Sequence, residues 1–288
     1  SSDLTRPYGR KGVAVHARSA IDLALWDLAG KAAGKPVYEL LGGPVKPDIP
    51  VYASALHPVG TEKVQAEAKA YVEEGYQAMK MRFPYGPGHG IAGMRANEEH
   101  VANVRDAVGD DIEIMADAYM GWDFLYAKKM VKRLEPYRLA WLEEAFLPDD
   151  LNSYAKLRQE TSIPISGGEH EYTRFGFQQI IEKQAMDIIQ PDLRRCGGLS
   201  EGRRICSLAL ANGITVIPHA YGPTHIHFAL AETAVPMIEY FPIPSWDDLP
   251  DAEVEPIFHD EPQPQNGRVT ASTKPGLGVT VNERIFAD

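Results

Sequence analysis

Three acidic residues occupy the same position in three consecutive segments of this sequence. Asp117, Glu143 and Glu169 are evenly spaced, and each one ends a short, largely apolar run. The interval is roughly the length of one strand–helix unit, and runs of this kind are typical of buried parallel strands. In a (β/α) barrel the carboxyl ends of all strands meet at one face. The spacing therefore predicts that these three carboxylates lie close together.

Three converging carboxylates repel one another unless a cation neutralises them. Ligation by oxygen alone suits a hard divalent ion, so we expect Asp117, Glu143 and Glu169 to hold Mg²⁺. The alternative is that they are three unrelated surface acids. The repeated order of strand, acid, loop and helix favours the metal site.

The rest of the sequence continues the alternation of strand and helix. Apolar runs predict eight strands, at 49–53, 77–83, 112–116, 139–142, 163–168, 186–190, 214–217 and 237–240. Apolar residues at helical spacing predict helices between them. Eight strands that alternate with helices are most simply closed as a TIM-like (β/α)7β barrel of the α/β class.

The same patterns divide the chain into three regions. Residues 48–241 form the predicted barrel, and residues 1–47 precede it with a helix at 14–33. Beyond the barrel, six prolines between Pro242 and Pro264 exclude a regular helix. We expect residues 242–288 to form an extended tail that packs outside the barrel.

Composition excludes several classes of partner. The chain of 288 residues carries 40 acidic and 29 basic residues, for a formal net charge of −11. The acidic balance and the scattered basic residues argue against nucleic acid or an anionic membrane as partner. The sequence has no apolar run of membrane-spanning length and no signal-peptide pattern, and its two cysteines are too few for a disulfide framework. We expect a cytoplasmic enzyme that acts on a small molecule.

Further chemical groups end the remaining predicted strands. His219 is the best candidate general base, because its ordinary pKa lies near neutral pH. Asp192 ends the preceding strand and is placed to orient the imidazole. Lys80 and Glu239 end other strands, and Lys80 is suited to an anionic substrate. Arg82 cannot act as a base, because a guanidinium stays protonated, but it can bind a carboxylate or hydroxyl.

Four other residues are candidates for substrate contact at the predicted mouth. Glu144 and His170 directly follow two of the predicted metal ligands. Tyr119 and Trp122 follow Asp117, and they either line the mouth or pack in the core.

Three further residues are weaker candidates. His225 and His227 have the spacing of a strand-borne metal pair, but they fall where a helix is predicted, and there they do not share a face. Cys196 has no histidine nearby in sequence to activate it, so a packing role is expected.

Several motifs along the chain resemble the mandelate racemase-like branch of the enolase superfamily. They are residues 19–28 (SAIDLALWDL), 141–144 (WLEE), 168–169 (GE), 190–192 (QPD), 197–198 (GG) and 275–278 (PGLG). The resemblance implies that the three evenly spaced acids hold Mg²⁺. It also implies that His219 and Asp192 form a dyad and that Glu239 hydrogen-bonds a substrate carboxylate. Enzymes of this superfamily use a Lys or His base, and Mg²⁺ stabilises the enediolate that forms.

Within this branch, residues 80–87, 116–122 and 168–174 resemble the acid-sugar dehydratases. We therefore expect a Mg²⁺-dependent hydro-lyase that removes the C2 proton and the 3-hydroxyl of a sugar acid, and we expect a homo-oligomer. Arg82 stands where many racemases and epimerases of the branch carry a second basic lysine, which disfavours racemisation.

The family has an N-terminal α+β capping domain of about one hundred residues, which is within the usual domain size range. By resemblance, residues 1–47 correspond to the end of that domain, so we expect most of it to be missing. Two alternatives stay open. One is a racemase, epimerase or cycloisomerase on the same scaffold, and the other is a non-catalytic remnant that binds metal.

Overall fold

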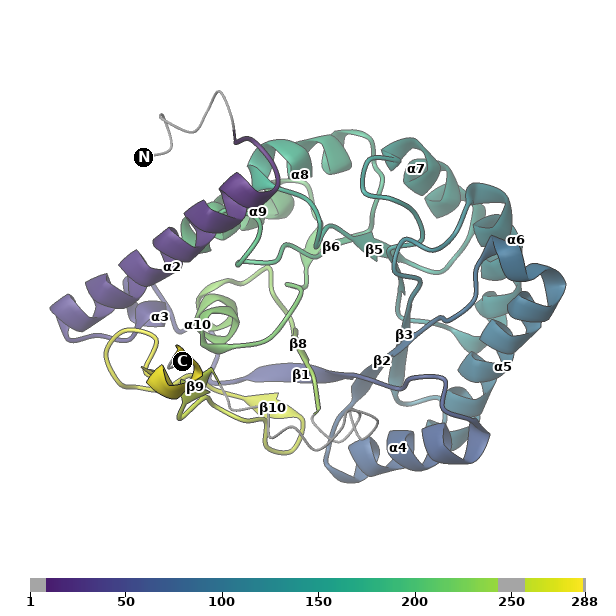
Figure 1. Cartoon of the computed structure of the whole chain (residues 1–288), viewed down its shortest axis with the longest axis horizontal. Helices are drawn as coiled ribbons and strands as arrows, with labels where there is room; N and C mark the ends of the chain where they lie inside the picture. Colours follow the sequence, from purple (N-terminus) through teal and green to yellow (C-terminus); the bar gives the residue numbers. More distant parts are fainter. Residues whose placement is uncertain (1–8, 243–256, 287–288) are drawn as a thin grey trace.

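Parallel strands form a curled sheet at the centre of the molecule (Figure 1). The computed structural model describes residues 9–242 and 257–286. In this part of the chain the parallel strands pair in the order β8-β1-β2-β3-β4-β5-β6-β7. A hydrogen bond also links the two ends of this strand order: the backbone N–H of Val216 on β7 donates to the carbonyl of Ala234, just before β8. The strands are β1 (Ile49–Ser54), β2 (Ala78–Arg82), β3 (Glu113–Asp117), β4 (Leu142–Glu143), β5 (Ile165–Gly167), β6 (Ile188–Ile189), β7 (Thr215–Val216) and β8 (Ile238–Tyr240).

Helices cover the outside of the sheet (Figure 1). They are α4 (Thr61–Glu73), α5 (Gly90–Val108), α6 (Phe124–Leu134), α7 (Leu151–Glu160), α8 (Thr173–Glu182), α9 (Leu199–Ala211) and α10 (Pro223–Ala231), with 3₁₀ turns η1 (Pro87–His89) and η2 (Glu135–Tyr137). Aspartates cap two of them, since the Asp123 side chain accepts from the Tyr126 N–H and Asp150 from the Ser153 N–H. Within the described residues, no helix is both long and apolar enough to span a membrane.

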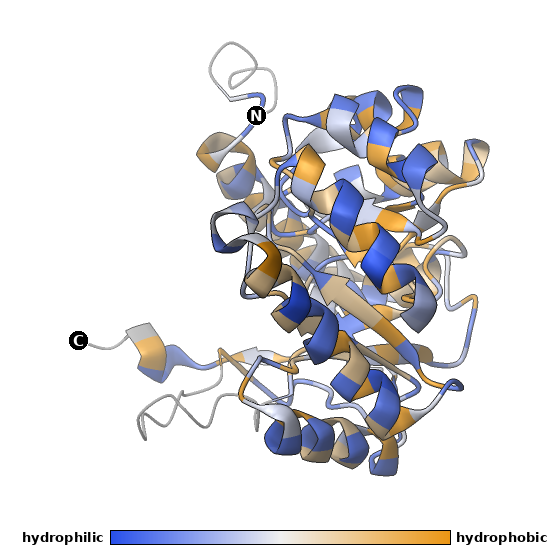
Figure 2. Cartoon of the chain, turned by 90° about the vertical axis from the view of Figure 1, so that its right-hand side faces the viewer, coloured by the Kyte–Doolittle hydropathy of each residue, from blue (hydrophilic) through white to orange (hydrophobic). Residues whose placement is uncertain are grey.

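Two apolar layers hold the sheet in place. The larger one lies between the strands and the surrounding helices. The smaller one consists of Tyr52, Ala78, Met115, Trp141 and Ile217. In Figure 2 the strands are mostly hydrophobic in colour, whereas the helices alternate between hydrophobic and hydrophilic residues. This is the pattern expected of parallel strands buried on both faces.

The N-terminal helix α2 (Val13–Ala33) packs against the start of α9, and the short α3 (Val37–Leu40) follows it. The backbone N–H of Ser200 donates to Asp22, and the indole N–H of Trp26 donates to the Ser200 hydroxyl at 2.9 Å. Gly198 lies so close to α2 that a Cβ there would be 2.3 Å from a carboxylate oxygen of Asp22. The glycine therefore permits the close approach of α2 to the sheet's helices.

The C-terminal segment returns to the beginning of the sheet. Strand β10 (Arg268–Val269) pairs antiparallel with the first residues of β1, and the N–H of Val37 donates to the carbonyl of Gly276. Strands β9 (Phe258–His259) and β11 (Thr280–Val281) pair with each other, and the turn η4 (Glu283–Phe286) follows. Residues 243–256, which belong to the predicted extended tail, lie outside the described residues.

Candidate active site

Lys80 lies between two buried carboxylates at the carboxyl ends of the strands. It comes from β2, is almost fully buried, and its Nζ contacts both Glu143 and Glu239, the latter at 2.9 Å. Burial disfavours its charge, but attraction to Glu143 and Glu239 outweighs burial and raises the pKa of Lys80. The same attraction counters burial at Glu239 and lowers the pKa of that carboxyl to about 2. The pair is therefore ionised, with Glu239 also accepting from the N–H of Ala220.

Asp117 and Glu143 are Cα partners across the β3–β4 ladder. Asp117 is buried and accepts from the Tyr119 N–H at 2.7 Å, and its other oxygen lies 3.3 Å from Arg82. Burial, followed by repulsion from Glu143, raises the pKa of Asp117 to about 7. When ionised, Asp117, Glu143 and Glu239 carry three negative charges, against the two positive charges of Lys80 and Arg82. This charge excess and the all-oxygen donors fit a hard divalent cation.

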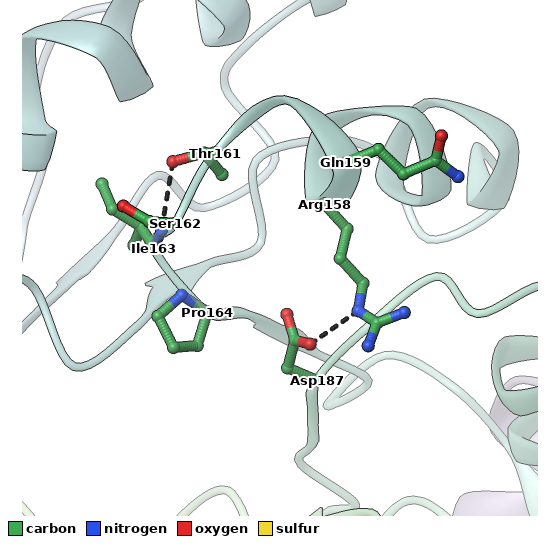
Figure 3. A pocket seen from close by; sticks show the side chains of 7 residues that line it. All are labelled: Arg158, Gln159, Thr161, Ser162, Ile163, Pro164 and Asp187. Atoms are coloured by element: carbon green, nitrogen blue, oxygen red, sulfur yellow. Dashed lines mark hydrogen bonds and ion pairs between the residues drawn. The ribbon is translucent and has the colours of Figure 1, made fainter.

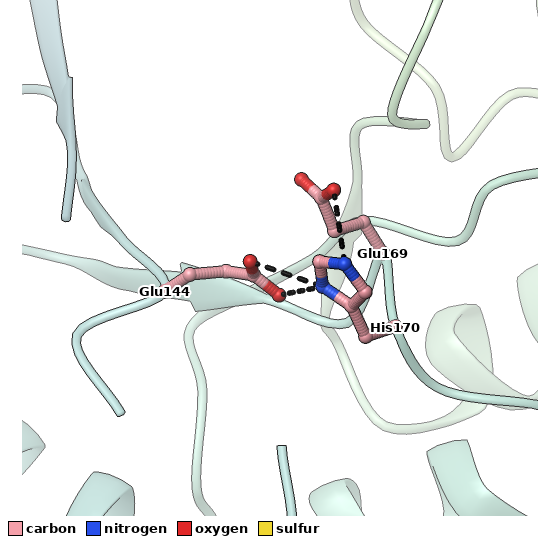
Figure 4. Close-up of side chains that lie close together, drawn as sticks. All are labelled: Glu144, Glu169 and His170. Carbon is pink, nitrogen blue, oxygen red and sulfur yellow. Dashed lines mark hydrogen bonds and ion pairs between the residues drawn. The ribbon is translucent and has the colours of Figure 1, made fainter. Parts of the chain in front are cut away.

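Glu169 follows β5 and lies among positive and polar groups. Arg195 donates to its Oε1 at 3.0 Å, and Nε2 of His219 lies 3.3 Å from the same oxygen. Of the groups the structure describes, Glu144, Glu169 and His170 bring their possible ligand atoms within 4.8 Å of one another (Figure 4). Asp117 and Glu143 lie outside this group of three. Of the three predicted ligands, Glu169 therefore lies beside His170 and His219. Glu143 contacts Lys80, and Asp117 contacts Arg82.

His219 and Asp192 form a hydrogen-bonded pair. Nδ1 of His219 lies 3.0 Å from Oδ2 of Asp192, and both side chains are buried. A carboxylate partner favours the tautomer with the proton on Nδ1, which leaves Nε2 as the basic nitrogen. Burial lowers the pKa of His219, but Glu239 and Asp192 outweigh burial and raise it. The hydrogen bond from His219 and nearby Arg194 hold the pKa of Asp192 below its usual range despite burial.

His170 forms a second pair with Glu144. Its Nδ1 lies 2.9 Å from Glu144 Oε1, and this bond raises the pKa of His170. Glu144 is buried, so it holds His170 rather than facing the mouth as the sequence suggested. The backbone of Glu144 has φ 43°, a left-handed conformation that is costly for a glutamate. Tyr119 is exposed and its ring lies edge-on to His170 at 6.1 Å, as expected for a residue at the mouth.

The structure corrects the prediction that Trp122 contacts substrate. Trp122 is buried, its indole N–H donates to the Tyr85 carbonyl at 2.9 Å, and its ring stacks on Phe83. Both its apolar face and its polar N–H are therefore used inside the protein. Of the two positions that the sequence allows for Trp122, the mouth and the core, the structure shows the core.

The other weak candidates, His225, His227 and Cys196, are buried within the fold. His227 accepts from the N–H of Tyr38, and its second ring nitrogen lies 3.1 Å from the carbonyl of Leu277. His225 is buried, with its Nε2 3.9 Å from Asp192. Cys196 is fully buried, and burial raises the pKa of its thiol.

Three residues at the site were not singled out in the sequence. Arg195 bridges Glu169 and Asp192, at 3.0 and 3.4 Å. Trp141 and Gln190 both hydrogen-bond Glu143. Trp141 and Gln190 belong to the family-like motifs at 141–144 and 190–192, but nothing in their spacing indicates that they reach the same carboxylate.

The two cavities described in the structure lie elsewhere. One, of about 260 Å³, is lined by residues before β5 and β6, including Pro164 and Asp187, which Arg158 binds (Figure 3). The other, of about 510 Å³, is lined by residues at the amino ends of β1, β2, β3 and β8. Both lie at the end of the sheet opposite to His219 and the acids, where a barrel ordinarily carries no catalysis.

Comparison with known proteins identifies relatives of this chain. Residues 63–285 match the enolase C-terminal domain-like family, and residues 3–42 match the N-terminal domain of the mandelate racemase and muconate lactonizing enzymes. The L-rhamnonate dehydratase of Saccharopolyspora erythraea is 38% identical over 290 residues, covering 98% of this chain and 70% of that protein.

Two solved structures are also similar. Rhamnonate dehydratase from Gibberella zeae complexed with Mg is 36% identical with a TM-score of 0.88, covering 99% of this chain and 68% of that one. The 3,6-anhydro-D-galactonate cycloisomerase from Zobellia galactanivorans is 32% identical with a TM-score of 0.87, covering 98% of this chain and 78% of that one.

Proposed function

Because the chain belongs to the mandelate racemase and muconate lactonizing enzyme family of the enolase superfamily, we propose that it is a Mg²⁺-dependent acid-sugar dehydratase. The substrate class is L-rhamnonate or a similar sugar acid, and the product is a 2-keto-3-deoxy sugar acid. The observation that carries this proposal is the His219–Asp192 pair, whose Nε2 faces Glu169 and Glu239. The relatives named as rhamnonate dehydratases support the choice of substrate class.

Asp117, Glu143 and Glu169 would hold the cation. The excess of carboxylates over cations around Lys80 and Arg82 and the raised pKa of Asp117 support this assignment, as does the relative from Gibberella zeae complexed with Mg. When bound, Mg²⁺ supplies Lewis-acid chemistry by polarising a substrate carboxylate and making the adjacent C2–H more acidic. Lys80 lies next to Glu143 and would attract the same anionic end of the substrate.

His219 would move the protons. Its Nε2 takes the proton from C2, and the electron pair of that C–H bond expels the 3-hydroxyl. The imidazolium returns its proton to the leaving hydroxyl, so one water is lost and the resulting enol tautomerises to the ketone. Asp192 supports the imidazolium at the moment it carries charge. A single base on one face suits elimination, because racemisation needs a second base on the opposite face.

Other residues would position the substrate. Arg82, His170 and Tyr119 are partly or largely exposed and lie around the acids. Glu239 is ionised and can only accept hydrogen bonds, so it is unsuited to donate one to a substrate carboxylate. We propose instead that Glu239 holds Lys80 and the Ala220 N–H in place.

A cycloisomerase is the second candidate, since such an enzyme is among the similar structures. The two activities differ in mass balance, because a cycloisomerase keeps every atom and a dehydratase releases water. The test is incubation with a panel of sugar acids and Mg²⁺, followed by mass spectrometry and NMR. Loss of one water with a new 2-keto signal supports the dehydratase. A product of unchanged mass whose bond connectivity differs by NMR supports the cycloisomerase. An epimer of unchanged connectivity contradicts both and points to a racemase or epimerase, and no turnover with any acid also contradicts both.

A further inference from the structure

We propose that Trp141 and Gln190 are positioning residues that leave Glu143 a single oxygen, Oε1, with which to bind a cation. The inference rests on the proposed Mg²⁺ site and deepens it. It concerns two side chains that have no acid–base function themselves. Each donates a hydrogen bond to the same carboxylate oxygen, and both are buried.

The two donors flank different strands, β4 and β6. The indole N–H of Trp141 lies 2.9 Å from Glu143 Oε2, and the amide nitrogen of Gln190 lies 2.8 Å from the same oxygen. Trp141 immediately precedes β4, two residues before Glu143, and so shares its side of the strand. Gln190 directly follows β6 and reaches past β5 to the carboxylate. A carboxylate cannot donate, so the amide of Gln190 must turn its N–H₂ toward Glu143.

Glu143 has few acceptor sites left for a cation. A carboxylate oxygen has about two lone pairs for hydrogen bonds or metal. Trp141 and Gln190 occupy both on Oε2. Lys80 occupies one on Oε1, so the remaining lone pair of Glu143 is on Oε1. Glu143 therefore offers a cation one oxygen, and the two donors determine which one.

Packing keeps both donors in place. Trp141 is 2% exposed and meets the ring of Tyr52 edge-on at 5.4 Å. Gln190 is 1% exposed, and its backbone N–H donates to Gly167 at 2.8 Å. Neither side chain can turn to water, so the orientation of Glu143 is set before any cation arrives. Outer partners that orient a metal ligand typically contribute about 10–100-fold in metal affinity.

The test uses Trp141→Phe and Gln190→Met, which remove one donor each while keeping bulk. Two matched controls also lose one donor: Trp26→Phe, whose indole bonds Ser200, and Gln65→Met, whose amide bonds the Asn103 carbonyl. Affinity for Mn²⁺, used as a paramagnetic substitute for Mg²⁺, is measured by electron paramagnetic resonance on proteins whose fold is checked by circular dichroism. We expect each site variant to bind Mn²⁺ about 10–100-fold more weakly than wild type. The controls should bind within about twofold of wild type, because their partners lie away from the ligands.

A second measurement needs no change at the site. The indole N–H resonance of Trp141, identified by substituting the other three tryptophans in turn, should shift when Mg²⁺ is added, whereas that of Trp26 should not. A Trp141 resonance that Mg²⁺ leaves unmoved overturns the inference, as do folded Trp141→Phe and Gln190→Met proteins with wild-type Mn²⁺ affinity. If Mn²⁺ binds wild type but not Glu143→Gln, either of these overturning results refutes the positioning role and leaves the metal site standing. A wild type that binds no Mn²⁺ refutes the metal site and this inference together.

Discussion

His170 and His219 direct their Nε2 atoms at the same oxygen, Oε1 of Glu169, from 3.8 and 3.3 Å. In each ring Nδ1 is held by a carboxylate, Glu144 for His170 and Asp192 for His219. The pairs differ in access to water, since the His170 side chain is 26% exposed and that of His219 is 11% exposed. His219 also lies near Glu239, and His170 does not share this contact. The two histidines are therefore similar in chemistry but separable by mutation.

Replacing His219 by Asn should remove dehydration and keep the cation site. General acid–base catalysis contributes about 10²–10⁴-fold per proton transfer, and His219 is proposed to serve in two of them. We expect kcat to fall by at least about 10⁴-fold, with Mn²⁺ affinity near wild type, because His219 is not a proposed ligand. His170→Asn should change KM more than kcat. Near-normal kcat in His219→Asn would mean that another group takes the C2 proton.

Replacing Glu143 by Gln should weaken cation binding by more than about 100-fold. This is the upper end of the loss in affinity that follows when a partner of a metal ligand is removed. The amide keeps the shape but loses the charge that the cation needs. Glu201→Gln is the matched control, since Glu201 is also a buried carboxylate but binds Arg174 at 3.0 Å on the outer helices. Isothermal titration with Mg²⁺ measures both. Equal affinity in the two variants would exclude Glu143 as a ligand.

Buried histidines should make the protein less stable in acid. Burial lowers the pKa of His225 to about 3, so the folded state keeps this ring neutral. In the unfolded chain it titrates near its ordinary value of about 6.5. Between about pH 6.5 and 3 the unfolded state thus binds more protons than the folded state. Each unit by which the pH falls in that window lowers the free energy of unfolding by about 1.4 kcal/mol.

The variant His225→Leu removes this group, so its free energy of unfolding should depend less steeply on pH. Urea unfolding at pH 7.5 and at pH 5, followed by tryptophan fluorescence, measures the difference. We expect the pH-dependent loss in the variant to be smaller than in wild type by about 2 kcal/mol. An identical pH dependence in both proteins would show that His225 takes up a proton in the folded state.

The start of α7 offers a paired test of helix capping. Asp149 and Asp150 are both suitable residues, and the structure uses Asp150, whose Oδ1 accepts from the Ser153 N–H at 3.1 Å. We expect Asp150→Ala to lower the free energy of unfolding by about 1 kcal/mol, and Asp149→Ala to change it by much less. Chemical unfolding of both variants decides the matter. The reverse order of the two effects would place the cap at Asp149.

The regular part of the fold was predictable because each element leaves a local pattern. All eight predicted runs overlap a strand, and the match to the family confirms the resemblance that the motifs suggested. The boundaries shift where pairing rather than apolarity sets them. The run 139–142 is apolar throughout, yet β4 begins only at Leu142, where it pairs with Ala116.

The contacts that cross the sheet left no such pattern. The sequence predicts either the mouth or the core for Trp122, because an aromatic side chain suits both. Arg195 lies three residues beyond Asp192, and whether it turns toward Glu169 depends on the loop's conformation. Gln190 reaches Glu143 only because curling of the sheet brings β6 near β4. Such relationships arise from the curvature of the whole sheet and are absent from any short segment.

The pairing of β1 with β8 and β10 has a consequence for how the chain comes to be folded during its synthesis. A ribosome releases β1 before β2 to β7, whereas both of these partners emerge only after β7. Until then one edge of β1 presents unpaired N–H and C=O groups, which are prone to join the strands of other chains. Contacts of such long sequence separation also form slowly. The growing chain therefore needs protection of this edge until β8 and β10 have emerged.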